Sequence, residues 1–257
     1  MIARRAESTQ DPLYTTIMYY IEDLLEETSA LSDIAAFLPA LTWLETLTGI
    51  RKRYKHLTEQ GRDPAYGRII QEGLETGKDC VYRRMVESRE EYELDDVDLL
   101  VTTSDIIGAA SDTTSTTLAW SLAILCHHPE VQKKISSELD QFIETHGRLP
   151  TFAERDNFPY MISVQKECLR YRTINHMGIP HAAEADFEYN GYVIPKGAML
   201  ISNVAAMHMN PDDFANPEVF IPERFIHNTT PMAASANGKI EDRDVYSFGW
   251  GSLAADY

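Results

Sequence analysis

The sequence predicts a mostly helical fold with a small antiparallel sheet, an α+β arrangement. Over most of residues 11–172, apolar side chains recur at intervals of three and four, which is the spacing of amphipathic helices. Residues 187–194 then show an Asn-Gly pair between two short apolar and aromatic runs, which is typical of a β-hairpin. At 257 residues and 44% hydrophobic, the chain is long enough to bury a sizeable core.

The first part of the chain, residues 11–91, is predicted to be helical throughout. From residue 11 to about 48, the apolar spacing indicates amphipathic helices broken near Pro39, with these apolar positions: Leu13, Ile17, Tyr20, Leu24, Phe37, Leu38, Leu41 and Leu44. A further helical stretch follows to about Glu91. Its runs of charge are typical of a solvated face.

A long helix is predicted from Asp95 to His128. Acidic residues cluster just before it, where negative charge favours the positive end of a helix dipole, and Pro129 follows it. Because several Ser and Thr hydroxyls compete for carbonyls in its middle, we expect a loosened turn within residues 108–114. Two more helices are predicted, one from Pro129 to Gly147 and one over residues 160–171.

After residue 171 the sequence pattern changes from the spacing of helices to that of short strands and turns. Phe187–Tyr189 and Tyr192–Ile194 are predicted to pair through a type I′ turn at Asn190-Gly191. Pro195 to Gly197 then makes a second turn, and a third strand is predicted over residues 198–203. Proline and asparagine dominate residues 210–222, which predicts an irregular, turn-rich segment.

Composition argues against several classes of partner. The formal net charge of −17 repels phosphate backbones and anionic membrane surfaces, so nucleic acid is not an expected partner. The three cysteines, Cys80, Cys126 and Cys168, are widely spaced, and buried thiols are the expected state. We find no apolar run of the roughly 20 residues that a transmembrane helix needs.

Four motifs carry the candidate chemistry. They are "AASDTT" at residues 109–114, "ECLR" at 167–170, "IPERF" at 221–225 and "FGWG" at 248–251. An acid followed by two threonines inside a helix is either a polar stripe or a place where proton donors are needed. Taken alone, Glu167 and Arg170 would be an ordinary surface pair one turn apart.

The glycine motif has other interpretations. Residues 249–254 fit the loose G-x-G-x-x-A pattern of a dinucleotide loop, but such a loop needs a following helix and an acidic residue about 20 positions on. Neither is present in the sequence. A simple glycine turn is the other alternative.

Taken in order, the four motifs resemble the cytochrome P-450 family of haem-thiolate monooxygenases, in its microsomal and fungal form. The resemblance implies that residues 1–257 are the C-terminal-half fragment of a single cytochrome P-450 domain, with a partial fold truncated at both ends. Its expected parts are a helical segment (1–92), the long central helix (93–128), helices that include ExxR (129–172), a small sheet (185–204), and the PERF loop with an incomplete haem-binding loop (205–257).

The resemblance also implies roles for individual residues. Asp112 and Thr113 would deliver protons on the distal side of haem b. Glu167, Arg170 and Arg224 would form a buried charge cluster that braces the loop carrying the haem ligand. Four residues would contact the cofactor: His181, Phe248, Gly249 and Gly251. The implied partners are an NADPH-dependent reductase and a small apolar substrate.

The sequence departs from the family pattern F-x-x-G-x-R-x-C-x-G. After Phe248 and Gly251, the arginine falls on Leu253, the metal-ligating cysteine on Ala255 and the last glycine on Tyr257. These consecutive mismatches suggest a foreign tail, and they leave no metal ligand. Thr173 stands where many relatives have proline.

Because the metal ligand is missing, we expect a monooxygenase family member that is itself inactive. The alternative is a non-catalytic helical remnant that binds no haem. Family members lie at the endoplasmic reticulum membrane, but the anchor is missing from this sequence, so its location stays open.

Overall fold

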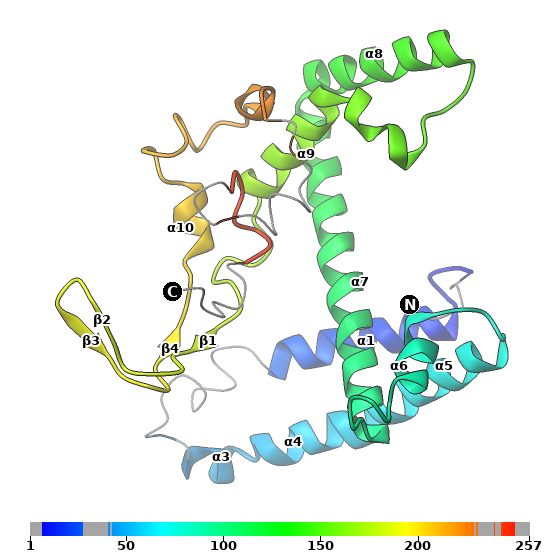
Figure 1. Ribbon diagram of the computed structural model, residues 1–257, viewed down its shortest axis with the longest axis vertical. Helices are drawn as coiled ribbons and strands as arrows, with labels where there is room; N and C mark the ends of the chain where they lie inside the picture. Colours follow the sequence, from blue (N-terminus) through cyan, green and yellow to red (C-terminus); the bar gives the residue numbers. More distant parts are fainter. Residues whose placement is uncertain are drawn as a thin grey trace. The chain divides into compact units, whose positions relative to one another are not determined.

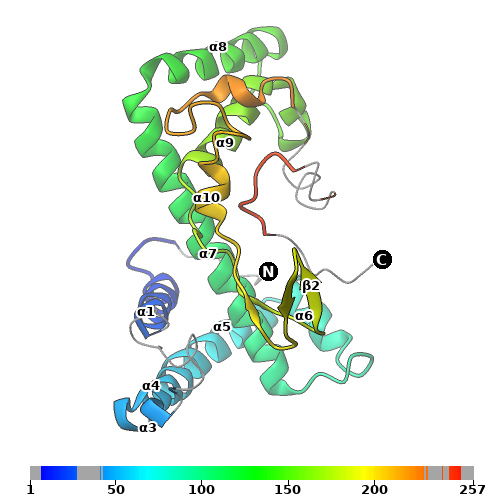
Figure 2. The same cartoon turned by 90° about the vertical axis from the view of Figure 1, so that its left-hand side faces the viewer.

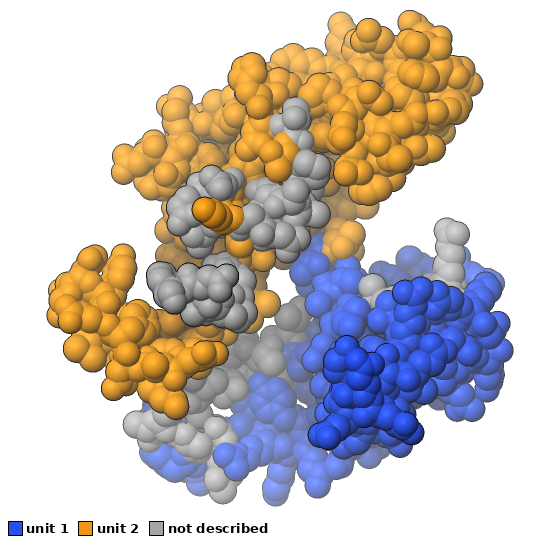
Figure 3. Space-filling model, viewed as in Figure 1, with its two compact units in different colours: residues 1–113 blue, residues 114–257 orange. Residues whose placement is uncertain are grey.

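The computed structural model describes residues 7–27, 41, 43–228, 230, 239 and 243–249. These residues belong to two compact units, Met1–Thr113 and Thr114–Tyr257 (Figure 3), which are described separately below. The predicted helical positions Phe37 and Leu38 with the break at Pro39, and the loop positions from Trp250 to Tyr257, lie outside the described residues.

The first unit is helical over its described residues (Figure 1). Its elements before the long helix are α1 (Pro12–Glu27), α3 (Trp43–Thr48), α4 (Ile50–His56), the π-helix η2 (Leu57–Arg62), α5 (Asp63–Glu75) and α6 (Val81–Glu87). Asp11 begins α1 by accepting the amide of Leu13 at 2.8 Å, and Pro12 occupies the first turn, where its missing N–H costs nothing. The buried core joins α1, α5 and the long helix through these residues: Leu13, Ile17, Ile21, Tyr66, Ile69 and Ile107.

The long helix α7 spans Asp96–His127, as the sequence predicts to within one residue at each end. Asp95 and Asp98 exchange side-chain bonds with each other's amides, at 2.8 and 3.0 Å, and so cap its N-terminus. The predicted loosened turn is absent, because the helix stays α-helical through residues 108–114. Thr113 does donate its hydroxyl to the carbonyl of Ala109, at 2.7 Å. That carbonyl can accept this bond alongside a backbone bond, since it has two lone pairs.

The second unit begins with the end of α7 and two further helices. Helix α8 (Pro129–His146) starts at a proline and ends at Gly147 in the left-handed conformation, with a φ of 68°. The 3₁₀-helix η3 (Phe152–Asn157) opens with a capping box formed by Thr151 and Glu154, and α9 (Pro159–Tyr171) follows. A buried cluster holds α7, α8 and α9 against the loop that contains Phe220; its members are Ile124, Val131, Tyr160, Val164, Cys168 and Phe220.

The strands differ in part from the prediction. The hairpin is confirmed: β2 (Phe187–Tyr189) pairs antiparallel with β3 (Tyr192–Ile194), and Asn190 and Gly191 both have positive φ, as a type I′ turn requires. The expected third strand is shorter and does not extend this hairpin. It is β4 (Met199–Leu200), and it pairs with β1 (His181–Ala182) in a separate two-stranded sheet.

The turn at residues 195–197 explains this second pairing. It directs the chain back toward Ala183, whose amide donates to the carbonyl of Ala198 at 3.0 Å and whose carbonyl accepts the amide of Gly197 at 2.8 Å. The β2–β3 hairpin, which precedes this turn in the chain, extends away from α8 and α9 (Figure 2).

A short helix and a turn-rich loop complete the second unit. Helix α10 (Val204–His208) is capped by Asn203, whose side chain accepts the amide of Ala206 at 3.0 Å. Turns and bends then fill residues 210–219, as predicted, and the 3₁₀-helix η4 (Pro222–Phe225) contains the PERF sequence. Contacts between α9 and η4 place this loop directly against the helix.

Replacing Gly178 with alanine tests the packing between the loop before β1 and the strand end after β4. Gly178 has a φ of 63°, and a methyl group there would collide with the hydroxyl of Ser202. Gly197 also has positive φ, but a methyl group there would meet nothing. We expect Gly197→Ala to lower the free energy of unfolding by about 1 kcal/mol. Gly178→Ala should cost up to about 1 kcal/mol more, because the Ser202 hydroxyl has to rotate away from the new methyl group. Urea unfolding measures both, and equal costs would contradict the predicted collision.

Candidate functional site

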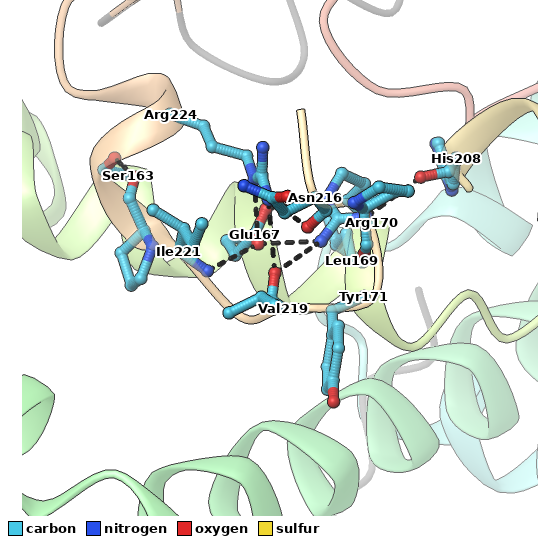
Figure 4. Close-up of polar contacts among 12 residues, drawn as sticks. Ser163, Glu167, Leu169, Arg170, Tyr171, His208, Asn216, Val219, Ile221 and Arg224 are labelled. Atoms are coloured by element: carbon cyan, nitrogen blue, oxygen red, sulfur yellow. Dashed lines mark hydrogen bonds and ion pairs between the residues drawn. The ribbon is translucent and has the colours of Figure 1, made fainter. Parts of the chain in front are cut away.

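A buried carboxylate, that of Glu167, is the centre of the polar contacts in the second unit. Its side chain is 0% exposed and accepts two bonds from Arg170, from Nε at 2.7 Å and from Nη2 at 2.8 Å. Nε of Arg224 approaches the same carboxylate at 3.3 Å, and the amide of Ile221 donates to it at 2.8 Å (Figure 4). The three predicted cluster residues therefore lie together, although 54 positions separate Arg170 from Arg224 in the chain.

The two guanidinium groups use their remaining donors on backbone carbonyls. Arg170 donates to the carbonyls of His208 at 2.9 Å, Pro217 at 2.8 Å and Val219 at 3.3 Å. Arg224 donates to those of Ala215, Asn216 and Val219. Two cations thus share one carboxylate, and carbonyl dipoles offset the excess positive charge. The cluster fixes the turn-rich loop and η4 to α9.

Local sequence explains why these groups meet. Glu167 and Arg170 stand at i and i+3 on α9, which places them on one face. Pro222 opens the 3₁₀ turn that puts the Ile221 amide and the Arg224 side chain on the same side of the loop. The hydroxyl of Ser163, one turn before Glu167, donates to the carbonyl of Pro222 and holds that turn in place.

His208 is a buried residue of this region that the sequence reasoning missed. Its Nε2 accepts the amide of Tyr246 at 2.8 Å, so Nδ1 carries the ring proton and faces the hydroxyl of Thr173 at 2.6 Å. Burial, with a smaller contribution from the Arg170 charge, lowers the pKa of His208 to about 4. One feature of the sequence could have indicated this buried histidine. Thr173 stands at the family's proline position, and its hydroxyl is the hydrogen-bond partner of His208.

The cofactor residues predicted from the sequence lie in two places. Phe248 is 53% exposed, and Gly249 has a φ of 79°, a conformation that favours glycine; both belong to the described segment 243–249. His181 lies half-buried in β1, opposite Leu200. Gly251 and Ala255 lie outside the described residues. Among the residues that the structure describes, no group of three His, Cys, Asp or Glu side chains could hold a metal ion.

The predicted proton-delivery residues lie in the first unit. Asp112 is half-buried on α7, and Thr113 is exposed. Their adjacent positions on one helix are the only geometric relation that the sequence predicts for them.

Comparison with known proteins identifies the family. The family model described as Cytochrome P450 matches residues 1–253. The chain belongs to the cytochrome P450 family. The resemblance read from the four motifs is thereby confirmed, and membership of this family implies a haem cofactor.

Individual relatives show the extent of the match. The chain is 32% identical to the cytochrome P450 monooxygenase atE of Aspergillus terreus over 259 residues, covering 95% of this chain and 48% of that protein. It is 41% identical over 140 residues to the steroid 17-alpha-hydroxylase/17,20 lyase of Ictalurus punctatus, covering 54% of this chain and 27% of that enzyme. The chain thus spans at most about half the length of these curated cytochrome P450 relatives.

A solved structure agrees. A zebra fish cytochrome P450, determined with progesterone, matches with a TM-score of 0.71 and 26% identity, covering 89% of this chain and 53% of that one. This supports a mostly helical cytochrome P450 fold that is partial in this chain. Within the described residues, the helices are too short or too polar to cross a membrane.

Replacing Glu167 with glutamine tests the buried cluster. The change leaves two buried guanidinium groups without their carboxylate, and we expect the free energy of unfolding to fall by about 3–5 kcal/mol. Glu223→Gln is the matched control, because Glu223 is half-exposed and pairs with Lys134 at 2.5 Å near the surface. The control should cost less than about 1 kcal/mol. Urea unfolding of both variants makes the comparison, and similar costs would contradict the proposed burial.

The buried, neutral His208 predicts a loss of stability in mild acid. Its folded pKa of about 4 lies below the ordinary value of 6.5, so the unfolded chain binds the proton more readily between these pH values. The free energy of unfolding should fall by about 3 kcal/mol as the pH drops from 6.5 to 4, and this contribution should level off below that. Carboxylates with a lowered pKa, such as Glu223, lose their contribution only below their ordinary value of 4.5.

Urea unfolding between pH 7 and pH 4.5 separates the histidine from the carboxylates. His208→Gln should remove most of the slope in this window, although it lowers stability at pH 7. A slope that persists unchanged in the variant would assign it to another group.

Proposed function

We propose that the chain is the C-terminal half of a haem-dependent monooxygenase that oxidises an apolar organic substrate with O2 and electrons from an NADPH-dependent reductase. The observation that carries the proposal is the buried carboxylate of Glu167 between two guanidinium groups, which ties η4 to α9. This arrangement braces the segment that leads to the glycine loop. In this proposal residues 1–257 form part of one domain, with α7 as its long central helix.

Asp112 and Thr113 are proposed to deliver protons. Haem, when bound, supplies the iron at which dioxygen is activated, and this chemistry needs protons brought through side chains rather than from bulk water. The hydroxyl of Thr113 donates to Ala109, and a hydroxyl oxygen can accept another bond while it donates. To relay a proton that Asp112 or water supplies, the Thr113 hydroxyl would turn its O–H from the Ala109 carbonyl to the next acceptor while its oxygen accepts the incoming bond.

The residues of the glycine loop do not fit a thiolate-ligated haem. Alanine has no donor atom for iron, and position 255 is where the family places its cysteine. The three cysteines of the chain lie elsewhere: Cys80 and Cys168 are buried, as expected, whereas Cys126 is exposed near the end of α7. We infer that the chain as given does not catalyse monooxygenation, even though Phe248, Gly249, Gly251 and His181 remain as candidate haem contacts.

A second candidate function is a non-catalytic helical protein that binds no haem and contacts other proteins. The observation that favours it is the exposure of large apolar side chains on α7: Leu118 at 59% and Leu122 at 56% lie one turn apart on one face, and Trp120 at 47% lies on another. Exposed apolar patches often mark interaction surfaces. A spectrum of the positive control described below separates the two candidates, because only the first requires haem to bind once the metal ligand is restored.

Restoring the cysteine alone should not restore the enzyme. Ala255→Cys supplies a sulfur at the right offset from Phe248, but Leu253 and Tyr257 still replace the family's arginine and glycine. We expect no thiolate-type absorption in the reduced, carbon-monoxide-treated variant and no NADPH-driven oxidation with a reductase.

The positive control joins the front half of a full-length relative to this chain and adds Leu253→Arg, Ala255→Cys and Tyr257→Gly. This protein should show both the thiolate-type spectrum and turnover. Turnover by the unmodified chain would overturn the inference of inactivity. If the positive control contained no haem, the proposed monooxygenase function itself would be wrong.

A further inference from the structure

Lys166 is a fully buried lysine that none of the four motifs explains. It precedes Glu167 on α9, and its side chain is 0% exposed. Its ammonium group donates to the carboxylate of Asp244 and, at 2.7 Å, to the carbonyl of Asn228. The Asp244 side chain is itself only 7% exposed. A lysine is rarely buried unless its charge is paired, so the burial of Lys166 depends on its contact with Asp244.

Asp244 lies in the short segment 243–249, which ends at the glycine loop. This segment is held at further points: the amide of Tyr246 donates to His208, and the hydroxyl of Ser247 lies 3.4 Å from the carbonyl of Leu169 on α9. Val245 is 2% exposed. Within the segment, Arg243 donates to the carbonyl of Gly249. The chain before the loop is therefore seated against α9 and α10.

Adjacent residues on a helix point about 100° apart, so Lys166 and Glu167 face different neighbours. Glu167 contacts η4 and the loop before it, whereas Lys166 contacts Asn228 and Asp244, which follow η4 in the chain. One turn of α9 thus anchors two successive parts of the polypeptide. A buried ion pair often adds little net stability, because desolvation offsets its attraction, but it can specify one geometry.

We propose that Lys166 and Asp244 are positioning residues that fix the segment 243–249 against α9, separately from the Glu167 cluster. The inference that this segment presents a haem loop rests on the proposed function. The anchoring of the segment rests only on the contacts of Lys166 and Asp244. Loss of the pair should release the segment locally while η4 stays in place.

Hydrogen–deuterium exchange of the full chain, with no haem added, tests this proposal. Lys166→Met should raise the exchange rate in a peptide covering residues 243–249 by about tenfold or more, because the amides of Tyr246 and Gly249 lose their fixed acceptors. The peptide covering residues 219–226, which contains the Ile221 amide bonded to Glu167, should exchange as before. Lys133→Met is the matched control: Lys133 is exposed on α8, and its loss should change neither peptide.

Asp244→Asn keeps the test decisive if Lys166→Met fails to fold. It preserves the shape of the side chain and removes only its charge, and it should raise exchange in the same peptide by a smaller factor. Equal acceleration in both peptides, or none in residues 243–249, would overturn the proposal. Because the readout needs no haem, a positive control that contained no haem would refute the proposed function and leave this inference intact.

Discussion

The second unit depends on one buried negative charge. The carboxylate of Glu167 receives Arg170 from its own helix, Arg224 from η4 and the amide of Ile221 from the loop between. A carboxylate without exposure to water must be paired, so the chain reaches low free energy only when these distant segments converge. The guanidinium groups then extend the constraint to five different carbonyls, which orders a loop that has little regular hydrogen bonding of its own.

The residues that hold the loops of the second unit in place differ from those that the family's reaction requires. The charge cluster, the His208 contacts and the Lys166 pair need only α9, α10 and the loops that follow them, and all are present. The thiolate chemistry of the cytochrome P450 family needs one sulfur atom, and in the proposed alignment of the glycine loop that position is Ala255. Among the described residues, the cluster forms from side chains and backbone groups of α9, α10, η4 and the loops between them.

Local patterns predicted the helices and the hairpin, because apolar spacing and the Asn190-Gly191 turn act over a few residues. The ends of α7 followed from its acidic cap and from Pro129. Pairing between distant segments could not be predicted in this way. The β1–β4 pair joins residues 17 and 19 positions apart, and no periodicity marks a two-residue strand. His208 and Lys166 were missed for the same reason, since only the folded chain shows that they are buried. Glu167 and Arg224 were found only through the order of the family motifs.

A double-mutant cycle between Glu167 and Arg224 tests the central claim most directly. Unfolding free energies of Glu167→Gln, Arg224→Met and the double variant give the coupling energy, free of the separate effects of each change. If the buried carboxylate holds η4 to α9 as described, the coupling should be about 2 kcal/mol, and the double variant should be more stable than the sum of the single losses implies. A coupling close to zero would show that the two residues act independently, and it would contradict the account.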